Sequence, residues 1–131
     1  MNVEQFRDTV SKKIVFGKTQ SEHAIQVSCI RYFRTKYPQY LIYAIPNGSY
    51  KSKTAALQMR AEGLTSGICD LHIPIARKGY NSFYIEMKKG KKGVLSENQK
   101  IMIERLRSYG NKVSVCRSLD DFIKEVDEYF S

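Results

Sequence analysis

The chain has 131 residues, with 42% hydrophobic and 11% aromatic side chains and a formal charge of +9. A chain of this length folds as one domain that buries about two-thirds of the surface its unfolded form exposes, so this composition excludes a disordered chain. Its apolar runs are far shorter than the about 20 residues that span a bilayer, and its polar N-terminus excludes a signal peptide. We expect a single intracellular domain over residues 1–131 with no membrane association, in which residues 1–18 form an N-terminal helical extension.

The first half of the chain predicts an amphipathic helix, a second helix, a buried strand, a turn and a third helix. Their ranges are 2–16, 19–37, 40–45, 46–49 and 53–62. The second helix starts from a capping box with Thr19 as the N-cap and Glu22 three residues later, and Pro38 closes it. Gly63 is placed as the C-terminal cap of the third helix.

The second half predicts two strands joined as a hairpin, a helix, a strand and a last helix. Their ranges are 69–76, 82–88, 96–110, 112–116 and 118–130. Ser96 and Ser118 stand at the N-cap positions of the two helices, and the polar residues 77–81 make the hairpin turn. The order α-α-β-α-β-β-α-β-α predicts an α/β fold with a mixed central sheet flanked by helices.

The distribution of charge indicates a polyanionic partner. From Arg117 onward the chain is acidic, so the excess of 22 Lys and Arg over 13 Asp and Glu lies elsewhere. The basic residues gather in three stretches, which are 51–60, 77–78 and 88–92. Clustered positive charge of this kind is typical of nucleic-acid binding, although an ordinary solvated basic surface would have the same composition.

The three cysteines, Cys29, Cys69 and Cys116, are scattered and contain no CxxC pair. An odd number of cysteines cannot all pair within one chain, which favours reduced thiols in a reducing compartment. The spacing also argues against a structural zinc site.

Two acidic residues and a lysine suggest a site at the predicted hairpin. Glu86 and Lys88 lie two residues apart in one strand, so their side chains share a face, and the hairpin places Asp70 opposite the Lys88 region. Converging carboxylates repel each other unless a cation lies between them, and oxygen ligands suit Mg²⁺ or Mn²⁺. A lysine beside such a pair orients a nucleophile or stabilises charge on phosphate. On spacing alone, a solvated sheet face without a ligand is an equally good interpretation.

The segments that carry these residues resemble the VRR-NUC family, a branch of the PD-(D/E)xK restriction-endonuclease-like superfamily. They are GLTSGICDL (63–71), YIEMKKGKKGVLSENQ (84–99) and VSVCRSLDDF (113–122), preceded by the SEHAIQ helix and the IPNGS turn. The resemblance runs from about Ser21 to Phe122, nearly the whole chain. It implies a restriction-endonuclease-like core and the stand-alone domain type found in phages and other viruses.

The family pattern is a helix glutamate, a G-x-P-D element, an E-x-K strand and a glutamine on the next helix. By position these are Glu22, Asp70, Glu86 with Lys88, and Gln99. One departure is plain, because Cys69 stands where the family usually has proline. That proline shapes the backbone and supplies no ligand, so we expect altered local geometry and retained metal binding.

The resemblance implies a role for each of these residues. Asp70 and Glu86 would bind Mg²⁺ or Mn²⁺, and the metal shell would be completed by the backbone carbonyl of Met87 and by Glu22. Lys88 would position or activate the attacking water. A further group would contact DNA: Asn47, Lys51, Lys53, Lys89, Lys91 and Lys92.

Simpler interpretations exist for three of the polar residues. The capping box alone would explain Glu22, although its neighbours Ile25 and Cys29 put it on the side of the helix that faces the core. Gln99 closes a capping box with Ser96, and it could also orient a ligand or the lysine. His72 shares a face with Asp70, yet it reads more readily as a surface histidine than as an auxiliary base or phosphate contact.

The predicted function is a metal-dependent, structure-selective DNA endonuclease. Small stand-alone members of the family resemble Holliday junction resolvases, which act as homodimers on branched DNA, and a protein of phage origin would act in the host cytoplasm. A two-fold dimer also matches the symmetry of a four-way junction. Two alternatives stay open: a nuclease acting on single-stranded, flap or nicked DNA, and a non-catalytic basic DNA-binding module on the same fold.

Overall fold

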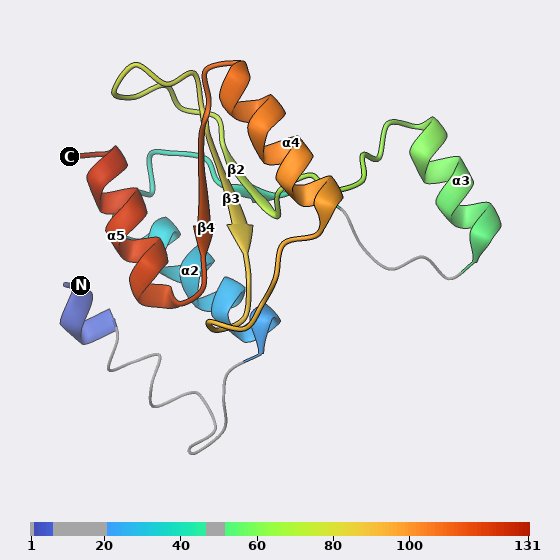
Figure 1. The fold of residues 1–131 in the computed structure, drawn as a ribbon. Helices are drawn as coiled ribbons and strands as arrows, with labels where there is room; N and C mark the ends of the chain where they lie inside the picture. Colours follow the sequence, from blue (N-terminus) through green and yellow to red (C-terminus); the bar gives the residue numbers. More distant parts are fainter. Residues whose placement is uncertain (1, 7–20, 47–51) are drawn as a thin grey trace.

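The computed structural model describes residues 2–6, 21–46 and 52–131 (Figure 1). Within these residues the strands form one mixed four-stranded sheet flanked by helices, so the predicted α/β fold is confirmed. The helices are α2 Glu22–Lys36, α3 Lys53–Ala61, α4 Glu97–Ser108 and α5 Leu119–Tyr129. The strands are β1 Tyr43–Ala44, β2 Leu71–Ile73, β3 Phe83–Met87 and β4 Lys112–Cys116.

The strand order in the sheet is β1-β2-β3-β4, with two antiparallel pairings followed by a parallel one. Strands β2 and β3 form the predicted hairpin, in which Leu71 pairs with Ile85 and Ile73 with Phe83. The tip is closed by a bridge between Arg77 and Tyr80. After β3 the chain crosses back through α4, so that β4 lies parallel to β3.

The main core lies between one face of the sheet and helices α2 and α5, which lie side by side (Figure 1). Its fully buried side chains come from all three elements and include Phe33, Phe83, Ile85, Met87 and Phe122. The alternating residues of β3, Tyr84 and Glu86, therefore point to the opposite face of the sheet. There a second cluster of Ile103, Leu106 and Val113 packs α4 against β4.

The predicted strand 40–45 is largely wrong. Only Tyr43 and Ala44 pair with β2, and both are exposed. The buried residue of this stretch is Ile42, which is 1% exposed. Because the apolar run lies at the edge of the sheet, Ile42 packs into the core beside β2 and the run does not form a long strand.

The predicted start of the second helix is also wrong. Ser21 is the N-cap of α2, because its hydroxyl accepts the backbone N–H of Ala24 at 3.1 Å. Glu22 is consequently the first residue of the helix and not the third position of a capping box, while the predicted N-cap Thr19 lies outside the described residues. A glutamate in the first turn still interacts favourably with the helix dipole.

The predicted N-terminal helix is described only in part. Residues 3–6 are helical, and Phe6 is buried with its ring 5.4 Å from that of Tyr32. The rest of the predicted helix, residues 7–16, lies outside the described residues. The described turn thus packs on α2, whereas the role of the longer extension stays a prediction.

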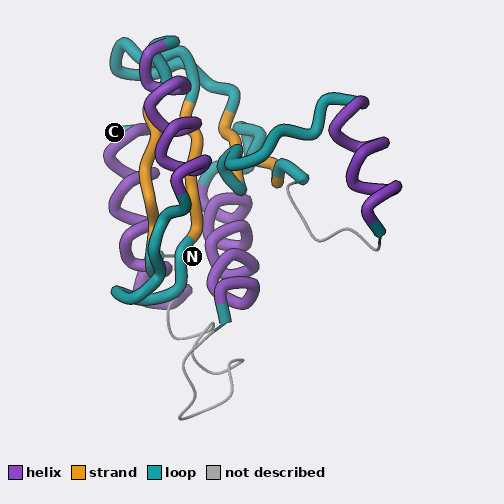
Figure 2. The backbone as a smooth tube through the Cα atoms, turned by 45° about the vertical axis from the view of Figure 1, so that its right-hand side comes forward, coloured by secondary structure: helices purple, strands orange, loops and turns teal. Residues whose placement is uncertain are grey.

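Helix α3 stands apart from the sheet and the other helices in both views (Figures 1 and 2). It begins after the N-cap Ser52 and ends before Gly63, whose φ of +111° fits the predicted glycine stop. None of its side chains is buried. Among the described residues, no helix is long and apolar enough to cross a membrane.

Candidate active site

Asp70 and Glu86 lie next to each other where β2 enters the sheet. The register that pairs Leu71 with Ile85 puts Asp70 across from Glu86, two residues short of the predicted Lys88 region. The Asp70 carboxylate accepts the backbone N–H of Met87 at 2.8 Å, which fixes it against β3. The hairpin therefore brings the two predicted carboxylates together, as the sequence analysis required.

Glu86 is buried, so a solvated sheet face is the wrong interpretation for this residue. Its side chain is 1% exposed, and its Oε2 atom has no hydrogen-bond partner among the described residues. Burial and the negative charge of Asp70 raise the pKa of Glu86 to about 9, while the charge of Lys88 lowers that pKa. A carboxylate held in this state has lost its hydration and accepts either a proton or a cation.

Gln99 closes the predicted capping box and also contacts Glu86. Its side-chain oxygen accepts the backbone N–H of Ser96 at 2.9 Å, and the Ser96 hydroxyl accepts the N–H of Gln99 at 3.2 Å, which completes the capping box of α4. Its amide nitrogen donates to Oε1 of Glu86 at 3.2 Å. The start of α4 therefore holds Oε1 of Glu86, while Oε2 accepts no hydrogen bond from the described residues.

Glu22 does not face the core as the helix pattern predicted. It is exposed at the start of α2, so burial does not demand a partner for it. Its negative charge nevertheless raises the pKa of Glu86, which puts it within electrostatic range of the carboxylate pair. Glu22 therefore lies at the edge of the site and not inside it.

Lys88 and the lysines that follow it form a turn held by Arg117, a residue that the sequence analysis missed. The backbone N–H of Lys88 donates to the carbonyl of Cys116 at 3.0 Å, which extends the pairing of β3 with β4. The Arg117 guanidinium donates to the carbonyl oxygens of Gly90 and Gly93 at 2.9 and 2.5 Å. Arg117 thus positions the loop that presents Lys89, Lys91 and Lys92, which are all exposed. Only the nearness of β3 to β4 could have suggested this contact.

Gly67 is a second residue whose role the sequence analysis missed. It has a φ of +79°, and a Cβ atom placed on it would lie 2.5 Å from the backbone oxygen of Asn98. Asn98 also donates its side-chain amide to the Ser66 hydroxyl at 3.1 Å. The loop that leads to Asp70 therefore rests directly on the first turn of α4. The available signal was the glycine of the G-x-P-D element.

Replacing Gly67 by alanine should lower the melting temperature by about 5–10 °C and should slow cleavage by about tenfold or more. Both losses are expected because the added methyl group forces the Asp70 loop away from α4. Gly79→Ala is the matched control, since Gly79 has a similar φ of +83° but an added Cβ would meet nothing within 4 Å. Thermal denaturation and a cleavage rate measure both effects. Equal losses of activity in the two variants would contradict the positioning role of Gly67.

His72 is held in a hydrogen-bonded network and not aimed at the carboxylates. Its Nδ1 atom lies 2.6 Å from the Tyr43 hydroxyl, and its Nε2 atom lies 3.0 Å from the hydroxyl of Ser82, which in turn donates to Asn111. Because Ser82 uses its proton on Asn111, Nε2 of the histidine carries the hydrogen and Nδ1 accepts from Tyr43. Burial lowers the pKa of His72, in agreement with a neutral ring. Both ring nitrogens are therefore engaged, which leaves neither for an auxiliary base.

Comparison with known proteins identifies the family. Residues 20–120 match the VRR-NUC domain, which is well over half of the chain. The chain belongs to the VRR-NUC family. It is also similar to a solved structure named "VRR_NUC domain protein", with a TM-score of 0.71 and 25% sequence identity over 86% of this chain and 89% of that chain. No curated protein matches the chain.

VRR-NUC proteins are nucleases with a restriction-endonuclease-like fold, so this chain is a nuclease domain and DNA is its substrate. The matched range includes the hairpin, the start of α4 and the Arg117 turn. Cys69 replaces the usual VRR-NUC proline without separating the two carboxylates. It is fully buried, and burial together with the charges of Glu86 and Asp70 raises the pKa of its thiol to about 12.

Nuclease domains of the VRR-NUC fold typically use a divalent metal, and the residues present fit one. The buried Oε2 of Glu86, which has no hydrogen-bond partner in the described parts of the chain, and the Asp70 carboxylate beside it are the oxygen donors that Mg²⁺ or Mn²⁺ prefers. Within the described parts of the chain, no three His, Cys, Asp or Glu side chains come close enough together to hold an ion. Two carboxylates suit Mg²⁺, which usually keeps several waters and shares substrate phosphate.

The predicted DNA contacts of this VRR-NUC domain are spread over two regions. The exposed residues Lys89, Lys91 and Lys92 lie in the turn that follows β3, the strand that carries Glu86. Lys53 is exposed on α3, which stands apart from the sheet (Figure 2). Asn47 and Lys51 lie outside the described residues.

Proposed function

We propose that this VRR-NUC protein is a metal-dependent endonuclease that hydrolyses DNA phosphodiesters. The observation that carries the proposal is the burial of Glu86 beside Asp70, where no described residue forms a hydrogen bond with Oε2 of Glu86. Burying a carboxylate in this way is strongly unfavourable unless a ligand compensates for the lost hydration. A structural role would favour a neutral side chain at this position, so the arrangement supports ligand binding.

Asp70 and Glu86 would hold Mg²⁺ or Mn²⁺, and we propose the backbone carbonyl of Met87 as a further ligand. Glu22 would join this shell only if its side chain moved in from the edge of the site. Once bound, such an ion polarises a phosphate oxygen and lowers the pKa of a neighbouring water. Asp70 is already oriented by the N–H of Met87, and Glu86 by the amide of Gln99. Both carboxylates therefore meet their ligand without rearranging.

Lys88 would orient the attacking water and stabilise the charge that develops on the phosphate. Its effect on the pKa of Glu86 supports this role, because the ammonium group must lie near that carboxylate to lower its pKa. Gln99 would act as a positioning residue through its hydrogen bond to Glu86. The turn held by Arg117 would set three lysines against the flanking phosphates, which gives affinity and register but no sequence specificity.

The substrate that we propose is branched DNA such as a four-way junction, cut by a homodimer. A body of 131 residues offers little surface for reading a long sequence, whereas two copies related by a two-fold axis present two sites to a two-fold symmetric junction. The N-terminal extension, residues 1–18, is the proposed dimer element. We also propose a viral origin and a site of action in the host cytoplasm.

A substrate panel tests this function. Labelled four-way junction, flap, linear duplex and single-stranded DNA are incubated with Mg²⁺, Mn²⁺ or EDTA, and wild type is compared with Asp70→Asn. We expect symmetric nicking of the junction that requires the metal, with the variant at least about 1,000-fold slower.

The same panel separates the alternatives. Cleavage restricted to flap, nicked or single-stranded DNA would keep the chemistry and change the substrate. Tight DNA binding by wild type with no cleavage in any metal would identify a non-catalytic DNA-binding module and contradict the proposed nuclease.

A further inference from the structure

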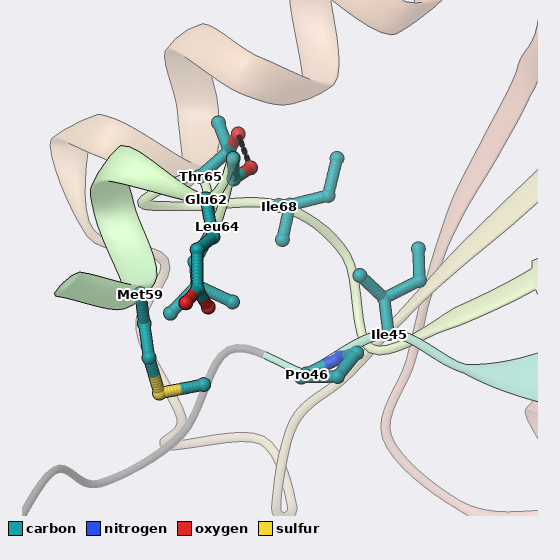
Figure 3. Close-up of a pocket in the computed structure, with 8 residues that line it drawn as sticks. Ile45, Pro46, Met59, Glu62, Leu64, Thr65 and Ile68 are labelled. Atoms are coloured by element: carbon teal, nitrogen blue, oxygen red, sulfur yellow. Dashed lines mark hydrogen bonds between the residues drawn. The ribbon is translucent and has the colours of Figure 1, made fainter. Parts of the chain in front are cut away.

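A pocket of about 430 Å³ lies between the end of α3 and the residues that follow β1 (Figure 3). Its walls are mostly apolar and are formed by Ile45, Pro46, Met59, Leu64 and Ile68. Two polar side chains, those of Glu62 and Thr65, also line it. The Thr65 hydroxyl donates to the carbonyl of Gly63 at 3.0 Å, which leaves Glu62 as the lining side chain whose polar atoms have no hydrogen bond among the described residues.

Glu62 is available to a ligand. It is exposed at the C-cap of α3, and its side chain points with that of Leu64 into the space between Met59 and Pro46 (Figure 3). Within the described residues its carboxylate makes no ion pair or hydrogen bond. The pocket therefore combines apolar walls with one carboxylate acceptor.

One wall of the pocket belongs to the backbone that carries the catalytic carboxylate. The N–H of Ile45 donates to the backbone carbonyl of Asp70 at 2.8 Å, and Ile68 precedes Asp70 by two residues. Ile68 also packs on the buried cluster that includes Cys69. A nucleotide adjoining a phosphate at Asp70 would consequently have its base beside this wall.

The chemistry of the pocket selects a nucleobase and disfavours a phosphate. A carboxylate with apolar neighbours repels an anion, whereas a base offers two apolar faces and a polar edge. The amino group of cytosine donates to a carboxylate, but the corresponding oxygen of uracil or thymine is an acceptor and would be repelled. We infer that the pocket takes one unpaired nucleobase of the DNA substrate, and that Glu62 selects bases with an exocyclic amino group.

This inference rests on the proposed function and deepens it. A base within a duplex cannot bring both its faces and its pairing edge to a protein pocket, so the base must be unpaired or extruded. Unpaired bases occur where strands branch, at flaps and in single strands. The pocket would thus supply base preference beside a cleavage site whose lysines contact only the DNA backbone.

The test compares short single-stranded oligomers of deoxycytidine and deoxyuridine by fluorescence anisotropy in EDTA, where the wild-type protein binds without cutting. The two ligands carry the same phosphates and have the same pyrimidine ring, but they differ in the amino or carbonyl group. We expect wild type to bind the deoxycytidine oligomer about fivefold more tightly. Glu62→Gln should reduce this preference to less than about twofold, because an amide both donates and accepts.

Glu128→Gln is the matched control, since Glu128 is an exposed glutamate on α5, which lies on the other side of the sheet from α3 (Figure 1). This variant should keep the preference for the deoxycytidine oligomer. Since α3 buries none of its side chains, Glu62→Gln does not threaten the fold.

Equal binding of the two oligomers by wild type, or an unchanged preference in Glu62→Gln, would overturn the inference. It would also be overturned if Glu62→Gln altered the oligomeric state in light scattering and left base preference unaffected, because the occupant would then be a second copy. Absence of cleavage on every DNA with the cytosine preference intact would remove the nuclease proposal and leave the pocket standing.

Discussion

Glu86→Gln should abolish cleavage, with a loss of at least about 1,000-fold, and should at the same time stabilise the protein in EDTA. The ordinary pKa of the glutamate is 4.5, and burial beside Asp70 raises it to about 9 in the folded protein. Between these values the unfolded chain releases a proton that the folded chain keeps, so the free energy of unfolding of wild type falls as pH rises. Below pH 4.5 that contribution is fully present, and by about pH 9 it is lost.

An amide in place of the carboxylate does not ionise, so the variant escapes this loss. We expect the melting temperature of Glu86→Gln to exceed that of wild type by about 5 °C at about pH 8, and the difference to shrink near pH 5. Thermal denaturation at the two pH values measures the effect, and Glu128→Gln on the exposed surface should show no shift. A variant less stable than wild type at the higher pH would contradict the inference that the buried Glu86 carboxyl group lowers the stability of the folded protein.

Lys88→Ala should slow cleavage by about 100-fold or more while the affinity for DNA changes less than about twofold. The lysine acts on the reacting group, and the other lysines of the turn supply phosphate contacts in its absence. Single-turnover cleavage and anisotropy in EDTA separate the two quantities. Because Lys88 lowers the pKa of Glu86, the residual activity of the variant should also require a higher pH.

Lys91→Ala is the comparison for this variant, since Lys91 is exposed in the same turn. Its cleavage rate at saturating DNA should be unchanged, and the dependence of binding on salt should weaken by about one phosphate contact. Full turnover by Lys88→Ala would refute the role assigned to that lysine, whatever the behaviour of Lys91→Ala.

The hairpin that carries the proposed active site was predictable because alternation and turn residues are local signals. Strands 69–76 and 82–88 were predicted longer than β2 and β3, yet their pairing brought Asp70 to Glu86 with an error of only two residues in register. The capping box of Ser96 and Gln99 was also readable from the chain, and the structure adds the hydrogen bond from Gln99 to Glu86.

What the sequence could not show depends on contacts between distant segments. Glu86 reads as an exposed residue from its spacing, and it is buried only because α4 covers that face of the sheet. Gly67 and Arg117 act by close approach to a helix turn and to a loop, which no periodicity reports. The run 40–45 has the composition of a strand, but an edge position leaves it almost without partners.

The detachment of α3 has a consequence for the energetics of substrate binding. A helix of nine residues is marginal in water by itself, and α3 gains nothing from buried side chains. Its backbone amides should therefore exchange with solvent far faster than those of α4, which packs on the sheet. If DNA fills the adjoining pocket, the ordering of this segment becomes part of the association. The measured affinity would then be weaker than the contacts suggest, and the heat capacity of binding would be more negative than that of rigid docking.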